Sequence, residues 1–428
     1  GHPHAPHDQR HGPGHPEEAA HAQGQDSAWL NLHIWGRGGA WTMVEQNGGH
    51  AIGPSLPPGG LPRRSKGEAR MSAVPEDPLA GIQLQWERPQ GVGAGLRNLG
   101  NSCYLNSVLQ CLTYTPPLAN LALARAHSRM CPIPEGQCSF CLLERRLYRS
   151  LTMATGAGAS DSPADIYQRI SHFSKSFIRG RQEDAHELMR YAVEALHRDC
   201  MKIARGPPYG AALTESQVLA LPGKAPPTQI STLFMGVLQN QVKCRECGRE
   251  SNTLEPSMDL SLDLHGVGDL LEALRDFSKV EELTGANRYK CDKCKRLVDA
   301  RKQMAIKQGP NVLCVHFKRF DGIFGGKIQR HVPFPAELDL AKYMSLRAPD
   351  TDPVYDLYGT LIHSGNTAHS GHYYAHVRDG QGRWHCMDDS STSTVSREEV
   401  LRTPAYMLFY VRRRARALLP EHPTPAEA

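Results

Sequence analysis

Two segments of the chain place apolar residues at the spacing of an amphipathic helix. In the first segment, apolar residues recur at intervals of three and four positions; they are Leu105, Val108, Leu109 and Leu112. In the second, from 182 to 200, the same spacing continues for longer, at Ala185, Leu188, Met189, Ala192, Val193 and Leu196. Residues at these intervals share one side of a helix, so we predict two helices that each bury one face.

A hairpin pattern lies farther along the chain, between residues 371 and 390. Its two arms are joined by Asp379-Gly380-Gln381-Gly382, a glycine-rich sequence that is typical of a turn between strands. With the hairpin centred near Gly380, His372 faces Asp388, with their Cβ atoms about 4.5 to 5.5 Å apart. A carboxylate at that distance fixes the tautomer and orientation of an imidazole. Taken alone, His372 is better explained as a strand-end histidine, and Asp388 and Asp389 as solvated turn acids.

Cys103 stands where a Gly-Asn-Ser loop turns into the first predicted helix. Asn101 and Ser102 are both favourable caps for its first turn. Backbone N–H groups and the positive end of the helix dipole favour a thiolate there, so we expect a depressed pKa for Cys103. A buried, inert cysteine is the alternative that this segment alone leaves open. With His372 and Asp388, the chain holds the residue types of a nucleophile, a general base and an orienting carboxylate.

Four motifs resemble the ubiquitin-specific proteases, and they occur in that family's order. They are Gly-Leu-Arg-Asn-Leu-Gly-Asn-Ser-Cys-Tyr-Leu-Asn-Ser-Val-Leu-Gln (95–110), Gly-Arg-Gln-Glu-Asp-Ala-His-Glu (180–187), Gly-His-Tyr-Tyr-Ala (371–375) and Trp-His-Cys-Met-Asp-Asp-Ser (384–390). The resemblance covers about residues 94–412. It implies an α+β, papain-like cysteine protease with a helical thumb, a β-rich palm and zinc-bearing fingers at about 232–305. The implied reaction is hydrolysis of the isopeptide or peptide bond after the C-terminal glycine of ubiquitin, through a thioester.

The resemblance also assigns roles to the residues around the nucleophile. It makes Cys103 the nucleophile, His372 the general base and acid, and Asp388 the residue that orients the histidine. Asn98 resembles the family's oxyanion donor, whose amide stabilises the negative charge of a tetrahedral intermediate. Asp389 matches a second acid that assists or replaces the first in some members, so the division of roles between Asp388 and Asp389 stays open.

Substrate recognition is assigned to other residues. Asp184 and Glu187 are neighbours near the start of the second predicted helix, where from the residues alone two acids simply complement the helix dipole. The resemblance implies that they bind the arginines of ubiquitin's Leu-Arg-Gly-Gly tail. It further implies that Gly371 and Tyr373, with the loop 364–370, flank the channel for that tail. The expected partners are ubiquitin and ubiquitinated proteins.

Two groups of cysteines suggest metal binding. Cys244-Arg-Glu-Cys247 and Cys291-Asp-Lys-Cys294 form a pair of CxxC knuckles, which favours one structural zinc over a redox motif. A second group, His127, Cys131, Cys138 and Cys141, has zinc-ligand types but an irregular first spacing. It leaves a second zinc site and unpaired buried thiols as open alternatives. We expect no organic cofactor.

Composition indicates the cellular compartment of the protein and argues against a membrane span. Twelve cysteines without a recognisable secretory signal suggest an intracellular protein, cytoplasmic or nuclear. No apolar run approaches the roughly 18 residues of a membrane span, and a net charge of +5 does not require a nucleic-acid partner.

Residues 1–93 are rich in Gly, Pro, Ala, Gln and His and are predicted to be disordered. We also expect a surface insertion at 206–227 and a basic, solvated tail at 413–428, with import or nucleic-acid binding as alternatives for the run Arg412–Arg416.

Two other classes of function compete with the protease. A ubiquitin-binding scaffold would keep the fold without the chemistry, but all three residues of the triad are present. A zinc-ribbon nucleic-acid binder would need basic and aromatic residues around the knuckles, whereas the stretch 251–282 between them is rather acidic. The sequence therefore favours the protease.

Overall fold

The computed structural model describes residues 82–153, 159–207, 213–220, 227–320, 326–346, 348, 350, 352–367 and 370–416. These residues belong to one compact unit, Met71–Ala428. Residues 1–81, where we predict disorder, lie outside the described residues, as does much of the predicted insertion at 206–227. Of the helices in the described ranges, none has the length and apolarity that crossing a membrane requires.

The predicted thumb is a group of helices that follow one another along the N-terminal half of this unit. They are α1 (Cys103–Thr113), α2 (Pro116–Ala124), α3 (Ser139–Thr152), α4 (Ala164–Tyr167), α5 (Ala185–Arg205), α6 (Glu215–Val218) and α7 (Gln229–Phe234). The two helices predicted from the apolar spacing, α1 and α5, are confirmed. In α5 the predicted apolar positions are buried, and the helix begins after Asp184, whose side chain accepts a hydrogen bond from the backbone N–H of Glu187 (3.0 Å).

The predicted palm is an eight-stranded sheet with strand order β15-β14-β13-β12-β16-β10-β5, to which β11 adds by pairing with β12. Its strands are β5 (Leu260–Asp263), β10 (Val312–Lys318), β11 (Glu337–Asp339), β12 (Val354–Thr367), β13 (Ser370–Arg378), β14 (Trp384–Asp388), β15 (Ser391–Val395) and β16 (Ala405–Arg412). Neighbouring strands are antiparallel except β10 and β5, which are parallel.

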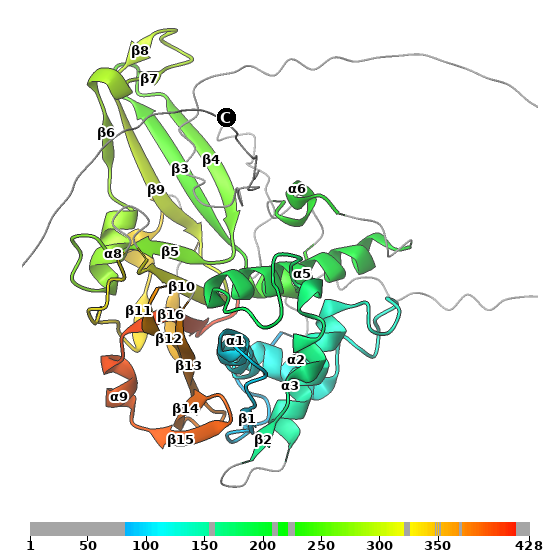
Figure 1. Ribbon diagram of the computed structural model, residues 1–428. Helices are drawn as coiled ribbons and strands as arrows, with labels where there is room; N and C mark the ends of the chain where they lie inside the picture. Colours follow the sequence, from blue (N-terminus) through cyan, green and yellow to red (C-terminus); the bar gives the residue numbers. More distant parts are fainter. Residues whose placement is uncertain are drawn as a thin grey trace, which may run out of the picture. The chain divides into compact units, whose positions relative to one another are not determined.

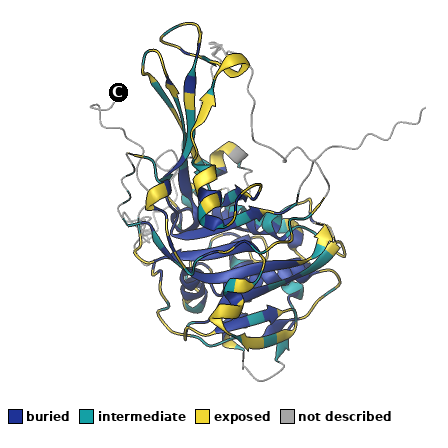
Figure 2. Cartoon of the chain, turned by 90° about the vertical axis from the view of Figure 1, so that its left-hand side faces the viewer, coloured by how far each residue is buried: buried dark blue, intermediate teal, exposed yellow. Residues whose placement is uncertain are grey.

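The sheet separates two hydrophobic cores. Successive side chains of a strand point to opposite faces, so Cys314 of β10 joins the core shared with the thumb helices, while its neighbours Leu313 and Val315 join the core on the other face. That second core is covered by α8 (Leu270–Phe277) and contains Val400 of α9 (Arg397–Arg402). Figure 2 shows the central strands of the sheet in dark blue, as buried, whereas the edge strand β15 is mostly exposed. The described residues also include three short 3₁₀ helices: η1 (Ile170–His172), η2 (Gly285–Asn287) and η3 (Ala341–Tyr343).

The predicted fingers are a separate four-stranded sheet with strand order β4-β3-β9-β6. Its strands are β3 (Gly236–Cys244), β4 (Glu250–Ser257), β6 (Glu281–Leu283) and β9 (Ala300–Gln308). The short pair β7 (Tyr289–Lys290) and β8 (Leu297–Val298) lies at its far end (Figure 1). The fingers were predicted as an insertion at about 232–305, but the middle of this range does not belong to them. The chain returns to the palm there, because Leu260, Leu262 and Leu264 are buried in the second core and β5 pairs with β10.

Residues 82–93, which we predict to be disordered, pack onto the fold in the structure. Ile82 and Leu84 are buried. The side-chain amide of Asn120 donates to the carbonyl oxygen of Gln85 (2.7 Å) and accepts from the backbone N–H of Glu87 (3.1 Å). Two buried apolar residues and this amide are enough to fix a segment whose composition alone suggests disorder.

The arginines of the basic run 412–416 pair with acids, and two of them are buried or nearly so. Arg412 is 2% exposed and donates to both carboxylate oxygens of Asp350. Arg416 Nη1 lies 2.8 Å from the same carboxylate, and Arg413 lies 2.8 Å from Asp356. Residues 413–415 are exposed, as predicted, although Arg413 and Arg414 pair with acids. The prediction is wrong for Arg412 and Arg416, which pair with the buried carboxylate of Asp350; residues 417–428 lie outside the described residues.

Candidate active site

Three elements that are distant in sequence carry the residues of the predicted triad. Cys103 is the first residue of α1, His372 lies on β13, and Asp388 ends β14. Helix α1 packs against β13 (Figure 1), and β13 pairs with β14. The thumb and the palm thus contribute the cysteine and the histidine from opposite sides of their shared core.

The histidine and the carboxylate meet as predicted, but through a different register. His372 Nε2 lies 2.5 Å from Asp388 Oδ1, and both side chains are about half exposed. Ala375 faces Met387 in the ladder, whereas a hairpin centred at Gly380 would pair it with residue 385. The predicted register is wrong by two positions, so His372 and Asp388 are diagonal rather than directly opposed neighbours, which long side chains still bridge.

The turn explains the shifted register. The carboxylate of Asp379 accepts hydrogen bonds from the backbone N–H groups of Gln381 and Arg383, each at 2.9 Å. Gly382 takes a left-handed conformation with φ +83°, which glycine adopts without a steric penalty. These contacts centre the turn on Gln381, one residue beyond the predicted position.

The thiol of Cys103 is buried at 2% exposure, and this reverses the predicted direction of its pKa. Burial raises the pKa of Cys103 above its usual value, and the charge of Asp389 raises it further. Hydrogen bonds from the backbone N–H groups of Tyr373, Tyr104 and Cys103 itself lower the pKa without outweighing burial. The helix terminus alone therefore does not create the thiolate, and a base must take the proton. His372 directly precedes Tyr373, whose backbone N–H reaches the thiol, and is therefore the candidate for that base.

Asn98 is fixed in place by hydrogen bonds at both ends of its amide. Its Oδ1 accepts from the backbone N–H groups of Gly100 (3.0 Å) and Ser102 (3.2 Å), and its Nδ2 donates to Asp389 Oδ2 (2.9 Å). An amide nitrogen carries two hydrogens, so one remains for a developing oxyanion. The other oxygen of Asp389 accepts from Asn106 Nδ2 (2.7 Å).

These contacts separate the two acids. Asp388 holds His372, whereas Asp389 is hydrogen-bonded to the amides of Asn98 and Asn106. Asp389 has φ +47°, a left-handed conformation that asparagine and aspartate tolerate better than most residues. The backbone carbonyl of Asp389 accepts from the N–H of Leu96 (2.7 Å), which joins it to the strand before Asn98.

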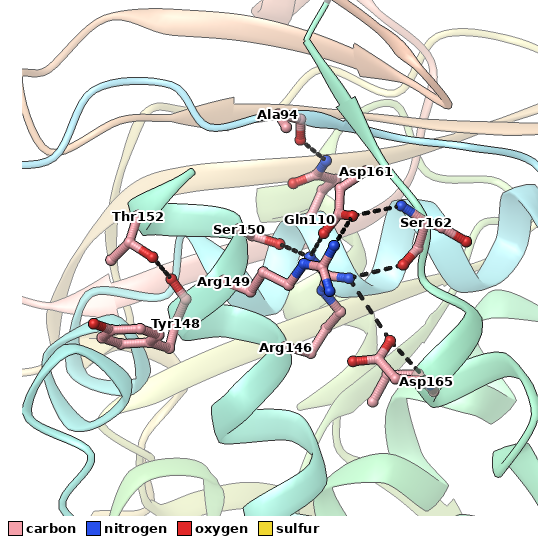
Figure 3. A network of polar contacts seen from close by, with 11 residues as sticks. Ala94, Gln110, Arg146, Tyr148, Arg149, Ser150, Thr152, Asp161, Ser162 and Asp165 are labelled. Carbon is pink, nitrogen blue, oxygen red and sulfur yellow. Dashed lines mark hydrogen bonds and ion pairs between the residues drawn. The ribbon is translucent and has the colours of Figure 1, made fainter. Parts of the chain in front are cut away.

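A buried ion pair supports that strand. Strand β1 (Gly95–Leu96) pairs in parallel with β2 (Ser160–Asp161). Figure 3 shows Arg146 and Arg149 of α3 directed at the carboxylate of Asp161. Arg146 is fully buried, and it also donates to the carbonyl oxygen of Ser162 (3.0 Å). Sequence reasoning missed this network because its acid and its arginines lie on different elements with no motif between them.

The two predicted recognition acids lie together at the start of α5. Asp184 caps the helix and accepts a hydrogen bond from the hydroxyl of Tyr406 (2.6 Å). Burial raises the pKa of Glu187, and the charges of Asp184 and Glu183 raise it further. Glu187 therefore lies beside two other acids, and the group offers a locally negative site that a basic ligand would stabilise.

Gly371 sits in a space that admits no side chain. A Cβ atom there would lie 2.4 Å from His363 Nε2 and 2.5 Å from the carbonyl oxygen of Ser364. The side chain of Gln182 clamps its backbone from the other side, accepting from Gly371 N (3.0 Å) and donating to Gly371 O (2.7 Å). Tyr373, two residues on, is 2% exposed and packs in the thumb core rather than on an open surface.

Both predicted zinc-ligand groups are assembled. The ligand atoms of Cys244, Cys247, Cys291 and Cys294 all lie within 4.8 Å of one another, and so do those of His127, Cys131, Cys138 and Cys141. In the first group, the Sγ atoms of Cys244 and Cys294 are 3.9 Å apart and those of Cys247 and Cys291 are 3.6 Å apart. These separations match the edge of a tetrahedron with zinc–sulfur bonds of about 2.3 Å, which is about 3.8 Å.

Comparison with known proteins identifies the same region. Residues 94–410 match the family model of ubiquitin carboxyl-terminal hydrolases. The chain is 42% identical over 346 residues to ubiquitin carboxyl-terminal hydrolase 25 of Arabidopsis thaliana, covering 77% of this chain and 50% of that protein. It is 38% identical over 360 residues to ubiquitin carboxyl-terminal hydrolase 17-like protein B of Mus musculus, covering 84% and 72%. The chain therefore spans half the length of the first relative.

The fold is also similar to solved structures. A chain in the structure of the SAGA Ubp8/Sgf11/Sus1/Sgf73 DUB module bound to ubiquitin aldehyde matches with a TM-score of 0.62 and 27% sequence identity. The match covers 76% of this chain and 70% of that chain. The similarity therefore extends over most of the described residues.

Proposed function

Because the chain belongs to the ubiquitin carboxyl-terminal hydrolase family, we propose that it is a cysteine-type deubiquitinase. It hydrolyses the isopeptide or peptide bond after the C-terminal glycine of ubiquitin. The observation that supports this most directly is that Cys103, at the start of α1, accepts a hydrogen bond from the backbone N–H of Tyr373, the residue next to His372, which in turn contacts Asp388. The competing scaffold function would not require this set of side chains.

The geometry supports a defined sequence of proton transfers. With its Nε2 on Asp388, His372 takes the Cys103 proton at Nδ1, and the thiolate attacks the glycine carbonyl carbon. The second amide hydrogen of Asn98 stabilises the resulting oxyanion. His372 then donates the proton to the leaving amine, which leaves a thioester on Cys103. Water, deprotonated by His372, cleaves the thioester and regenerates the thiol.

The charge of the α5 start supports selectivity for a basic tail. Asp184 and Glu187 are close enough for Asp184 to raise the pKa of Glu187. Arginine side chains of an incoming tail would offset that repulsion and form strong charge-assisted hydrogen bonds. The capping role of Asp184 is compatible with this, because a carboxylate has acceptor sites on both oxygens.

The two cysteine groups support structural zinc, one ion at each. The fingers group fits a tetrahedral Cys₄ site, and its backbone contact from Cys247 N to Cys244 Sγ (3.4 Å) has the form of a zinc knuckle. In the other group, His127 Nε2 lies 3.2 Å from Cys138 Sγ. The carboxylate of Glu144 fixes the backbone there by accepting from the N–H of His127 (2.8 Å). Zinc would cross-link each group without entering the reaction. Thiolate ligands of this kind also support an intracellular setting, cytoplasmic or nuclear.

Metal analysis tests the zinc proposal. Full-length protein purified without chelator should contain two equivalents of zinc, and Cys138→Ser should lower the content by one without affecting the fingers site. One equivalent that Cys138→Ser leaves unchanged would limit zinc to the fingers. Less than half an equivalent would contradict both sites.

Hydrolysis of ubiquitin bearing a C-terminal fluorophore tests the activity. Cys103→Ala should abolish turnover while ubiquitin binding remains, because the thiolate makes the bond and does not hold the tail. A ubiquitin-based electrophile should label the wild type at Cys103. Cys386→Ser is the matched control, since Cys386 lies beside the site on β14, and it should stay active. Labelling at Cys386, or an inert wild type that still binds ubiquitin, would contradict the proposal.

A further inference from the structure

Lys327 joins two segments that both lie next to the candidate site. It lies in the connection between β10 and β11 and forms an isolated bridge with Phe320. Its ammonium donates to the carbonyl oxygens of His363 (2.6 Å) and Gly365 (2.9 Å), and it lies 3.1 Å from His363 Nδ1. His363 and Gly365 belong to the end of β12, which runs to Thr367 and so includes the first part of the predicted loop 364–370. One side chain therefore ties the β10–β11 connection to the base of this loop.

The charge of Lys327 is held by neutral groups. Its three hydrogen-bond acceptors are two carbonyls and one imidazole nitrogen, and its ammonium lies 5.9 Å from the ring centroid of Phe320. Burial, followed by the nearby charge of Arg319, lowers the pKa of Lys327 to about 8. Hydrogen bonds from an ionised donor are shorter and stronger than neutral ones. The ammonium thus restrains the two carbonyls more firmly than a neutral side chain would.

Lys327 also fixes the state of the His363 ring. A nitrogen that lies within hydrogen-bond distance of an ammonium must act as the acceptor, so His363 is neutral and carries its proton on Nε2. Burial, followed by the charge of Lys327, lowers the pKa of His363 to about 4, which agrees with a neutral ring. Nε2 points at Gly371, where an added Cβ would lie only 2.4 Å away.

These contacts form a continuous path to the catalytic histidine. Lys327 holds the His363 ring, that ring packs against Gly371, and Gly371 directly precedes His372. The other side of Gly371 is clamped by Gln182. A second hydrogen bond, from Gln329 Nε2 to Asn366 Oδ1 (2.9 Å), joins the same two segments. Lys327 contacts the ring that touches Gly371 through a hydrogen bond, and Phe320 packs edge-on against that ring, with centroids 5.5 Å apart.

We propose that Lys327 is a positioning residue that sets the place of His372 through His363 and Gly371, and so determines the turnover of the proposed hydrolase. It touches neither substrate nor reacting atoms and acts only by holding the end of β12. Since misplacing a catalytic group by 1 Å can cost about 100-fold in rate, its loss should lower kcat more than it changes KM. This inference rests on the proposed function, although the positioning itself does not.

The test compares two single substitutions in the full-length protein. Lys327→Met removes the charge and all three hydrogen bonds at similar volume, and Lys342→Met is the control, because Lys342 is exposed on η3. On ubiquitin with a C-terminal fluorophore, Lys327→Met should lower kcat at least tenfold with KM changed less than threefold. Lys327→Arg, which keeps a cationic donor, should recover most of the loss. An unchanged kcat for Lys327→Met, or a loss that Lys342→Met reproduces, would overturn the proposal.

Hydrogen exchange separates positioning from activity. In the free protein, backbone amides of residues 364–367 and 370–371 should exchange faster in Lys327→Met than in wild type or Lys342→Met, while amides of β16 stay protected. Exchange that is unchanged at these positions would contradict the inference even if activity fell. If the wild type does not hydrolyse ubiquitin substrates, the proposed function fails, and the exchange comparison still decides whether Lys327 holds this loop.

Discussion

Removing the carboxylate of Asp161 should strongly destabilise the fold. Arg146 is fully buried and Asp161 is 4% exposed at the side chain, and the nearest other acid, Asp165, lies 3.7 Å from Arg146. Asp161→Ala therefore leaves a guanidinium buried without its direct partner. Breaking a buried pair in this way typically costs about 3 to 5 kcal/mol, a large part of the 5 to 15 kcal/mol by which domains are usually stable.

Urea denaturation followed by circular dichroism measures this cost. Asp161→Ala should lower the free energy of unfolding by about 3 to 5 kcal/mol, whereas the double variant Arg146→Met/Asp161→Leu should recover most of it, because no charge stays buried. Arg149→Ala is the control. Arg149 contacts the same carboxylate but is 56% exposed, so its loss should cost less than about 1 kcal/mol.

The pH dependence follows from the same pair. Burial raises the pKa of Asp161, but the hydrogen bond and charge of Arg146 outweigh it, so the pKa is lowered in the folded protein. A lowered carboxyl pKa stabilises the fold above its unfolded value of about 3.9, and this stabilisation is lost as pH falls through the folded value. The difference between wild type and Asp161→Ala should thus be constant from pH 5 to 8 and shrink below about pH 4. A cost under about 1 kcal/mol at pH 7, or a double variant as unstable as Asp161→Ala, would refute this account.

Two further predictions concern the site itself. Glu187→Arg should lower kcat/KM on ubiquitin substrates more than tenfold, because losing one partner of a desolvated charge pair typically costs about 2 to 5 kcal/mol. Alkylation of Cys103 by iodoacetamide should continue in this variant. An unaffected kcat/KM would show that the acids only stabilise the start of the helix. Asp389→Ala should lower kcat by freeing the Asn98 amide, and an unchanged kcat would show that this carboxylate does not position the oxyanion donor.

The sequence predicted the parts of the fold that depend on local periodicity. Apolar spacing identified α1 and α5, and the chemistry of Cys103, His372 and Asp388 was apparent from residue types and motifs. The hairpin was predicted, but its register was not, because the turn is centred by hydrogen bonds from the backbone to the Asp379 carboxylate. Such contacts between a side chain and the backbone leave no periodic signal in a sequence.

Burial and long-range pairing account for the other errors. The expected thiolate of Cys103 depended on the helix terminus, whereas desolvation by the packed thumb raises its pKa. Arg412 was expected to be solvated with the rest of its run, yet it is buried against Asp350, which lies 62 residues earlier in the chain. Lys327 carried no motif at all, since its contacts are with backbone carbonyls.

The cysteines at the tip of the fingers determine how this part of the protein responds to oxidants. Its small hydrophobic cluster consists of Val298 and Tyr289 with the four cysteines of the fingers group, so the proposed metal ligands are also most of the local core. Without metal, Sγ atoms 3.6 and 3.9 Å apart need to approach by less than 2 Å to form disulfides of about 2.0 Å. Each such bond would remove two thiols and release two electrons to the oxidant, after which those sulfurs no longer bind zinc as thiolates. With zinc bound, the four cysteines are held as metal ligands and are protected from peroxide. Without zinc, they are free thiols that peroxide can oxidise to disulfides at the far end of β3 and β9.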